Sequence, residues 1–189
     1  MEVILASTES WHATVGGIHK RIASFNREDN HGFKQDETDP WATDIEACGG
    51  EMAFAKGINV FYVPGINTFK SPDVGQFGVR HTSLFDGCLV IRPKDPPGIY
   101  VLVTGTMPVY QLRGWWNTRD GLEESWLRAP NNRPPAHFIP QGVLHDISTL
   151  PKEPQVHHEP DDIGRGEGKA GFDKFRREHQ GSVSEPIDF

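Results

Sequence analysis

The sequence is short of cysteine, of long apolar runs and of positive charge. It contains only two cysteines, Cys48 and Cys88, which are too few for a disulfide framework or a four-cysteine zinc site. No apolar run approaches the roughly 20 residues that a membrane-spanning helix needs. The segment from Met1 to Ser10 lacks the basic region and long apolar stretch of a secretory signal. These absences predict a cytoplasmic protein that does not associate with a membrane.

The balance of charge excludes one class of nucleic-acid-binding protein. The formal net charge is −7, whereas proteins that coat nucleic acid without sequence preference are normally basic. An enzyme that contacts nucleic acid locally remains open, because a single basic groove can lie on an acidic body. The chain also lacks a Walker-type phosphate loop, a dinucleotide fingerprint, a Gly-x-Ser-x-Gly elbow and a Cys-x-x-Cys motif.

Two helices are expected in the N-terminal part. Apolar residues recur at steps of three and four between Ser10 and Phe25, which predicts an amphipathic helix with His19, Lys20 and Arg21 on its polar face. Its predicted apolar stripe is Trp11, Val15, Ile18, Ile22 and Phe25. A second helix is predicted from about Asp44 to Gly57. Its apolar stripe is Ile45, Cys48, Met52 and Ala55. The polar segment 26–40 between the helices is expected to be a loop.

Beyond Pro72 the pattern changes from helices to strands. Four strands are predicted: Phe77–Thr82, Cys88–Arg92, Tyr100–Thr104 and Val109–Trp115. Their short, turn-rich connections predict an antiparallel meander paired in chain order. A short helix from Gly121 to Arg128 and a strand at His137–Ile139 complete the expected elements. The predicted fold is therefore α+β, with two N-terminal helices followed by a mainly antiparallel strand meander.

The composition shifts again near the C-terminus. Residues 151–189 are rich in charge, glycine and proline and carry only scattered apolar side chains. Such a segment buries too little surface to offset the entropy of ordering it. We therefore predict a single globular domain over residues 1–150 and a polar, poorly ordered tail over residues 151–189.

Glu51 is the first candidate for chemistry. At 100° per residue it projects onto the apolar arc of the second helix, while Glu46 projects toward solvent. A carboxylate on the buried side of a helix is costly unless it is paired, hydrogen-bonded or bound to a metal. The alternative is that Glu51 lies at the edge of the stripe and reaches water.

Asp73 and Arg80 form the second candidate. Strand alternation places Arg80 on one face, together with Gln76, Gly78 and Thr82, while a bend at Gly75 aims Asp73 toward it. A carboxylate that holds a divalent metal, next to a cation that offsets charge on a phosphoryl group, suits phosphate chemistry. The alternative is a turn aspartate that pairs with a surface arginine.

Together these pieces resemble a known superfamily. The helix carries Gly50-Glu51-Met52-Ala53-Phe54-Ala55-Lys56, then come Pro72-Asp73, a strand with Val79-Arg80-His81-Thr82, two apolar strands and Gly114-Trp115-Trp116. Over roughly Thr43 to Leu150 the chain resembles the PD-(D/E)XK nucleases, most of all their small phage-type members. The resemblance implies a restriction-endonuclease-like core and cleavage of DNA phosphodiester bonds with Mg²⁺ or Mn²⁺, in a phage or its bacterial host.

The same resemblance implies roles for individual residues. Glu51 corresponds to the helix carboxylate and Asp73 to the central aspartate, and both are the expected metal ligands. Arg80 corresponds to the terminal lysine as the third catalytic residue. The expected DNA contacts are Gln76, Thr82 and Trp116, the last of these by stacking on a base.

The chain departs from the superfamily pattern at Gly78, where a carboxylate or amide is the rule, and has arginine in place of lysine at Arg80. Arginine stays protonated and is a poor general base. Three functions therefore remain open. The first is a metal-dependent nuclease, and the second is an inactive DNA- or protein-binding accessory protein of the same fold. The third is an unrelated α+β protein whose acidic tail docks a partner.

Overall fold

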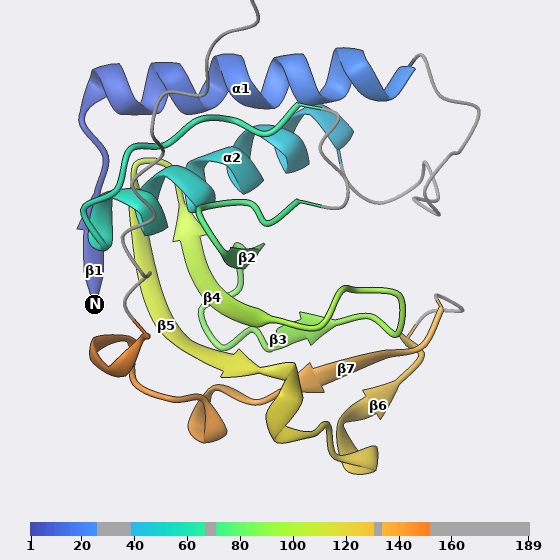
Figure 1. Cartoon of the computed structure of the whole chain (residues 1–189). Coiled ribbons are helices and arrows are strands. Elements are labelled where there is room, and N and C mark those ends of the chain that lie inside the picture. The colour runs from blue at the N-terminus through green and yellow to red at the C-terminus, as the bar shows by residue number, and fades with distance from the viewer. Residues whose placement is uncertain (26–38, 67–70, 131–133, 152–189) are drawn as a thin grey trace, which may run out of the picture. The chain divides into compact units, whose positions relative to one another are not determined.

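The computed structural model describes residues 1–25, 39–66, 71–130 and 134–151, and Figure 1 shows how their elements are arranged. The chain divides into two units, Met1–Lys152 and Glu153–Phe189. Most of the predicted loop 26–40 and nearly all of the predicted tail lie outside the described residues. The architecture below is that of the first unit.

Helix α1 (Ser7–Phe25) begins three residues before the predicted start at Ser10, and its predicted buried side is wrong. Trp11 is 70% exposed and Ile22 is 50% exposed. The buried positions of α1 are small residues: Ala13, Gly16 and Gly17. A Cβ atom at Gly17 would lie 2.5 Å from the Cα of Ile45, so the two helix backbones are in direct contact there. Close backbone packing, rather than the apolar periodicity, decides which side of α1 is covered.

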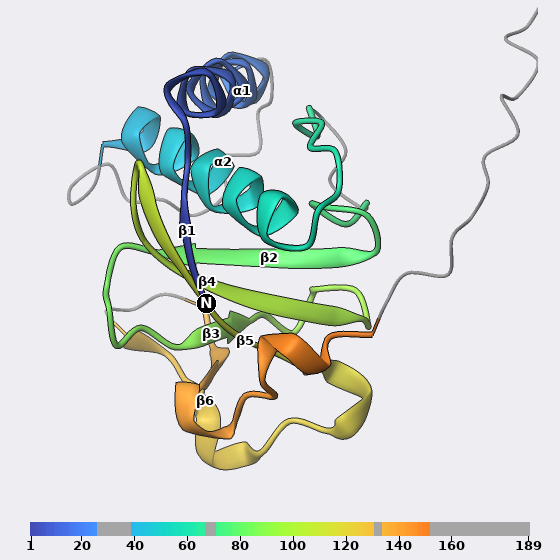
Figure 2. The ribbon, with the colours of Figure 1, turned by 90° about the vertical axis from the view of Figure 1, so that its left-hand side faces the viewer.

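Helix α2 (Pro40–Gly57) begins four residues earlier than predicted. The side chain of Asp39 accepts a hydrogen bond from the Trp41 N–H at 2.9 Å, and Pro40 occupies the first turn, where its missing N–H has no consequence. Residues Cys48–Ala55 are all buried. Figure 2 shows the reason, since α2 lies between α1 on one side and a sheet on the other.

The main sheet has the strand order β1-β5-β4-β2. Its strands are β1 (Glu2–Ile4), β2 (Phe77–Thr82), β4 (Ile99–Thr106) and β5 (Val109–Asn117). The four strands predicted beyond Pro72 all form, but the predicted pairing in chain order is wrong. β2 pairs with β4 in parallel, and only β4 and β5 form the expected antiparallel hairpin. The chain can return parallel to β2 because the strand between them leaves the sheet.

That strand, β3 (Leu89–Ile91), belongs to a second antiparallel sheet of order β3-β7-β6, with β7 at Ala136–Ile139 and β6 at Leu127–Arg128. The strand predicted near residue 138 is therefore confirmed. The predicted helix 121–128 is wrong: a 3-10 turn at Glu124–Trp126 leads directly into β6. Pairing of β6 with β7 and burial of Trp126 override the local helical preference.

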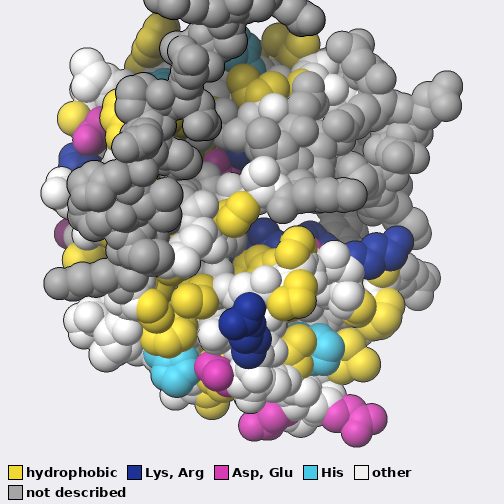
Figure 3. Space-filling view, in the orientation of Figure 1, with side chains coloured by type: hydrophobic (Ala, Val, Ile, Leu, Met, Phe, Trp, Pro, Cys, Tyr) yellow, Lys and Arg dark blue, Asp and Glu magenta, His cyan; other side chains and the backbone are white. Residues whose placement is uncertain are grey.

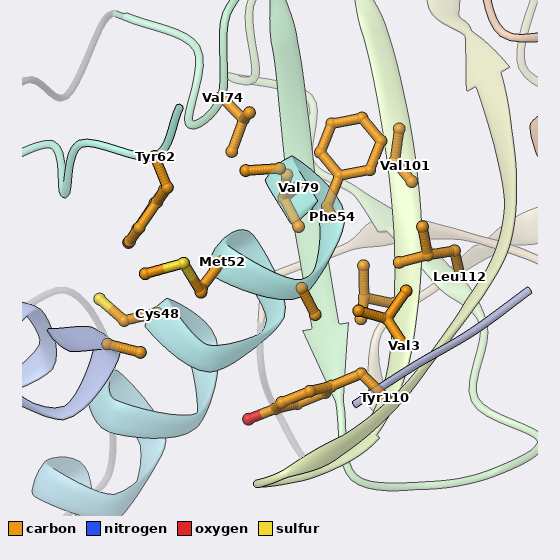
Figure 4. Close-up of a cluster of buried hydrophobic side chains, with 14 of the residues drawn as sticks. Val3, Cys48, Met52, Phe54, Tyr62, Val74, Val79, Val101, Tyr110 and Leu112 are labelled. Carbon is orange, nitrogen blue, oxygen red and sulfur yellow. The ribbon is translucent and has the colours of Figure 1, made fainter. Parts of the chain in front are cut away.

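Two clusters of apolar side chains fill the spaces on either side of the main sheet. The first lies between α2 and the sheet (Figure 4). Within it the rings of Phe54 and Phe77 meet edge to face, with their centroids 5.6 Å apart. The second lies between the two sheets and consists of Leu89, Ile91, Tyr100, Leu102, Trp126 and Ile139. The α+β class with two N-terminal helices is thus confirmed, with mixed and antiparallel sheets. Neither α1 nor α2 has the apolar length to span a bilayer, nor does any other helix within the described ranges.

Candidate functional site

Glu51 points into the protein, as predicted. The residue is only 5% exposed, in the stretch of α2 that is covered on both sides. The alternative, in which Glu51 reaches water at the edge of the helix, is wrong. Because a buried carboxylate needs compensation, its partners define the candidate site.

The compensation comes from two side chains elsewhere in the chain. Lys20 on α1 donates to both carboxylate oxygens of Glu51, at 2.7 and 2.8 Å. The hydroxyl of Tyr62, in the segment after α2, donates to Glu51 Oε2 at 2.7 Å. Lys20 was predicted on the polar face of α1 with His19 and Arg21, but Lys20 and Arg21 turn toward α2, while His19 is exposed. The one available signal was the spacing of Lys20 three and four residues from the glycine pair that packs against α2.

Neighbouring charges shift the pKa values of both Glu51 and Lys20. Burial raises the pKa of Glu51; Lys20 lowers it, and the negative charge of Asp73 raises it further. Burial lowers the pKa of Lys20, but the charges of Glu51 and Asp73 contribute to a net raised pKa. Asp73 therefore lies within electrostatic reach of both members of the buried ion pair.

Asp73 lies just before β2, the last strand in the order of the main sheet. Gly75 adopts a left-handed conformation with φ of 57°, which turns the chain back into the strand. Asp73 Oδ2 accepts the Val79 N–H at 2.7 Å and lies 3.8 Å from Nη1 of Arg80. The Asp73 carboxylate thus satisfies the backbone N–H of Val79 on the edge strand β2 and also contacts Arg80.

Arg80 lies on the face of the sheet that is turned away from α2. Its Nη2 donates to Asp95 at 2.8 Å, its Nε donates to the Val90 carbonyl, and its guanidinium lies 4.8 Å from the centre of the Tyr100 ring. Arg80 thus contacts Asp73 on this face, whereas Glu51 lies on the α2 side of the sheet. Asp95, which looked like a turn residue in Lys94-Asp95-Pro96, was missed as the main partner of Arg80.

The ring of Tyr100 fills the space beside Gly78. A Cβ atom at Gly78 would lie 2.5 Å from two carbons of that ring, which is itself buried in the second cluster. The position where the superfamily pattern has a carboxylate thus has no room for a side chain here.

The three expected substrate contacts lie in different parts of the structure. Gln76 is exposed in the turn before β2. Thr82 ends β2, where its hydroxyl accepts the Leu84 N–H at 3.3 Å. Trp116 packs against the second cluster, its ring stacked on His145 and its Nε1 donating to the Gly121 carbonyl.

Two further side chains of α2, Cys48 and Glu46, lie within two turns of Glu51 on the same helix. Cys48 is buried one turn before Glu51 on α2, and burial together with the charge of Glu51 raises the pKa of its thiol to about 11. Glu46 was predicted to face solvent. It is half-buried instead, because it accepts hydrogen bonds from the Tyr110 hydroxyl at 2.8 Å and the Met107 N–H at 3.1 Å.

The donor chemistry of Glu51 and Asp73 suits a hard divalent cation. Mg²⁺ is commonly held by one or two carboxylates and keeps several waters. No group of three or more His, Cys, Asp or Glu side chains that could hold a metal ion occurs within the described ranges. In the view of Figure 3 the visible surface over β5, β6 and β7 mixes apolar, basic, acidic and histidine side chains, without a broad patch of one charge.

Comparisons with protein-family models, curated proteins and solved structures find no match to this chain. The resemblance to the PD-(D/E)XK nucleases therefore rests on the sequence motifs alone.

Proposed function

We propose that the protein is a divalent-metal-dependent phosphodiester hydrolase that acts on DNA in the cytoplasm of a bacterial cell. The observation that supports the proposal is the buried carboxylate of Glu51. The negative charge of Asp73 contributes to raising its pKa, and the ammonium of Lys20 pairs with it at 2.7 Å. Helix α2 and the start of β2 supply one carboxylate each, as in the restriction-endonuclease-like core that the motifs predict.

In this proposal Glu51 and Asp73 hold Mg²⁺ or Mn²⁺. The bound ion would supply an activated water and neutralise charge on the phosphate. Lys20 contributes a second positive charge on the same side of the sheet. Arg80 positions Asp73 from the opposite side through its 3.8 Å contact, while Asp95 fixes the guanidinium.

A second candidate is a noncatalytic protein of the same fold that binds DNA or a protein partner. Two observations favour it. Tyr100 leaves no room for a third carboxylate at Gly78, and Arg80 is already engaged by Asp95. In this alternative the carboxylates and cations form structural ion pairs only.

Cleavage of single- and double-stranded DNA by the full chain, with Mg²⁺ or Mn²⁺, separates the two candidates. We expect cleavage by the unaltered protein and a loss of at least about 100-fold in Asp73→Asn and Glu51→Gln. The matched control is Glu9→Gln, which neutralises an exposed glutamate paired with Lys56 and should leave cleavage unchanged.

The outcomes are distinct. If the unaltered protein cleaves neither substrate and millimolar Mn²⁺ does not raise its melting temperature, the noncatalytic candidate replaces the nuclease. If cleavage survives in both Asp73→Asn and Glu51→Gln, the chemistry takes place elsewhere in the chain.

A further inference from the structure

The apolar stripe of α1 faces away from α2. We call its four described members the outer stripe: Trp11, Val15, Ile18 and Ile22. At 100° per residue they lie within an arc of about 60°, whereas Gly17 and Lys20, which contact α2, lie on the opposite side of the helix. Trp11 is 70% exposed and Ile22 is 50% exposed, and the other two members are half-buried. Apolar side chains aligned along one exposed face are typical of a protein contact surface, whereas single exposed ones are ordinary.

We propose that the outer stripe is a self-association surface, on which the outer stripe of a second copy of this chain packs antiparallel. Successive members of the stripe are four, three and four residues apart, so the spacing is the same in both directions. An isologous contact needs such a surface, because each patch must fit a copy of itself. A two-fold axis between Val15 and Ile18 places Trp11 of each copy against Ile22 of the other. Alternate steps of three and four residues are also those of helices that pair in coiled coils.

The charged residues of α1 do not oppose this contact. Each Glu, Lys and Arg of the helix pairs with a residue of α2: Glu9 with Lys56, Lys20 with Glu51, and Arg21 with Asp44. Two copies of α1 can therefore meet without unpaired like charges of these types between them. The same pairing leaves no Glu, Lys or Arg of α1 unpaired for DNA or for a strongly charged protein, which favours a second copy as the occupant.

The size of the outer stripe predicts a weak dimer. A standard interface buries about 800 Å² on each partner, and one face of a single helix covers only part of that area. Each copy also carries a net charge of −7, so two copies repel one another overall. We therefore expect a dimer that forms only as the protein concentration rises. This inference does not depend on the proposed function, because the stripe lies on the side of α1 that is turned away from Glu51.

Sedimentation velocity of the full chain, from low micromolar to millimolar concentration, tests the proposal. The average mass should rise from that of one chain toward that of two. Trp11→Glu and Ile22→Lys each place a charge in the apolar contact, and we expect either variant to dimerise at least about tenfold more weakly. Leu84→Glu is the matched control, because it adds the same charge at another exposed apolar side chain, 64% exposed and outside α1, and should dimerise as the unaltered protein does.

A mixture of the two variants tests the antiparallel arrangement. In a dimer of one Trp11→Glu chain and one Ile22→Lys chain, the two new charges meet at one end of the contact, and the unaltered Trp11 and Ile22 meet at the other. The equimolar mixture should therefore associate at least about threefold more tightly than either variant alone. A parallel arrangement would bring the new charges together at neither end and would give no such gain.

Each outcome decides the proposal. A mass that stays that of one chain at every concentration overturns it, as does a dimer that both single variants leave intact. An equal weakening by Leu84→Glu also overturns it, because the effect would then follow net charge rather than the outer stripe. A mixture without any gain overturns the antiparallel contact. If a charged variant does not fold, as judged by circular dichroism, Trp11→Ser and Ile22→Ser replace it and should also weaken the dimer.

Discussion

Replacing Gly17 by alanine tests how closely α1 packs on α2, the contact that brings Lys20 to Glu51. The added Cβ would lie 2.5 Å from Ile45 Cα, 2.7 Å from its nitrogen and 2.9 Å from the carbonyl carbon of Asp44. These are backbone atoms of a helix and cannot turn aside. Because ordinary contacts begin near 3.4 Å, the helices must part by about 1 Å.

The magnitude follows from two opposing effects. Overpacking costs about 1–3 kcal/mol, and three backbone contacts place Gly17→Ala toward the upper end. Alanine regains about 1 kcal/mol because it favours a helix more than glycine does. We expect a net loss of about 2 kcal/mol in the free energy of unfolding, which lowers the melting temperature by about 4–8 °C for a chain of this size.

Thermal and urea unfolding followed by circular dichroism measure this change. Gly142→Ala is the control, because nothing lies within 4 Å of the added Cβ there, and its effect should stay within about 0.5 kcal/mol. If Gly17→Ala unfolds at the same temperature as the unaltered protein or higher, α1 does not pack on α2 as described. The approach of Lys20 to Glu51 would then lose its basis.

Three other predictions concern the sheet and α2. Gly78→Ala should lower the free energy of unfolding by about 1–3 kcal/mol, because the added Cβ meets the Tyr100 ring. Gly98→Ala, which has open space around the added Cβ, should leave it unchanged, and equal effects of the two variants in urea unfolding would contradict this prediction. Burial lowers the pKa of His81, so the folded state binds fewer protons than the unfolded state below about pH 6.5, and stability falls as the pH falls. His81→Gln should therefore lose less stability between about pH 7 and pH 5 than the unaltered protein, and an equal loss would refute the assignment. Cys48, buried with a pKa of about 11, should react with a thiol reagent at neutral pH only after unfolding, and rapid modification of the folded protein would show that it is accessible.

The candidate site was only partly predictable. The inward direction of Glu51 followed from its angle on α2, and the face of Arg80 followed from strand alternation, because both depend on local geometry alone. Lys20 is separated from Glu51 by 31 positions, and Asp95 from Arg80 by 15. The glycine spacing on α1 points Lys20 toward a packed helix, but no local signal identifies the partner of Lys20 or of Arg80, so neither pairing was found before the elements were placed in space.

Apolar spacing alone correctly predicted the two long helices and the four strands beyond Pro72, because it reports on the backbone conformation of each segment. Only the tertiary structure decided that β3 leaves the main sheet and that β2 pairs with β4 in parallel. It also decided that α1 buries its glycines while Trp11 stays exposed. These outcomes depend on contacts between segments distant in sequence, where close backbone approach and burial outweigh the preferences of each segment alone.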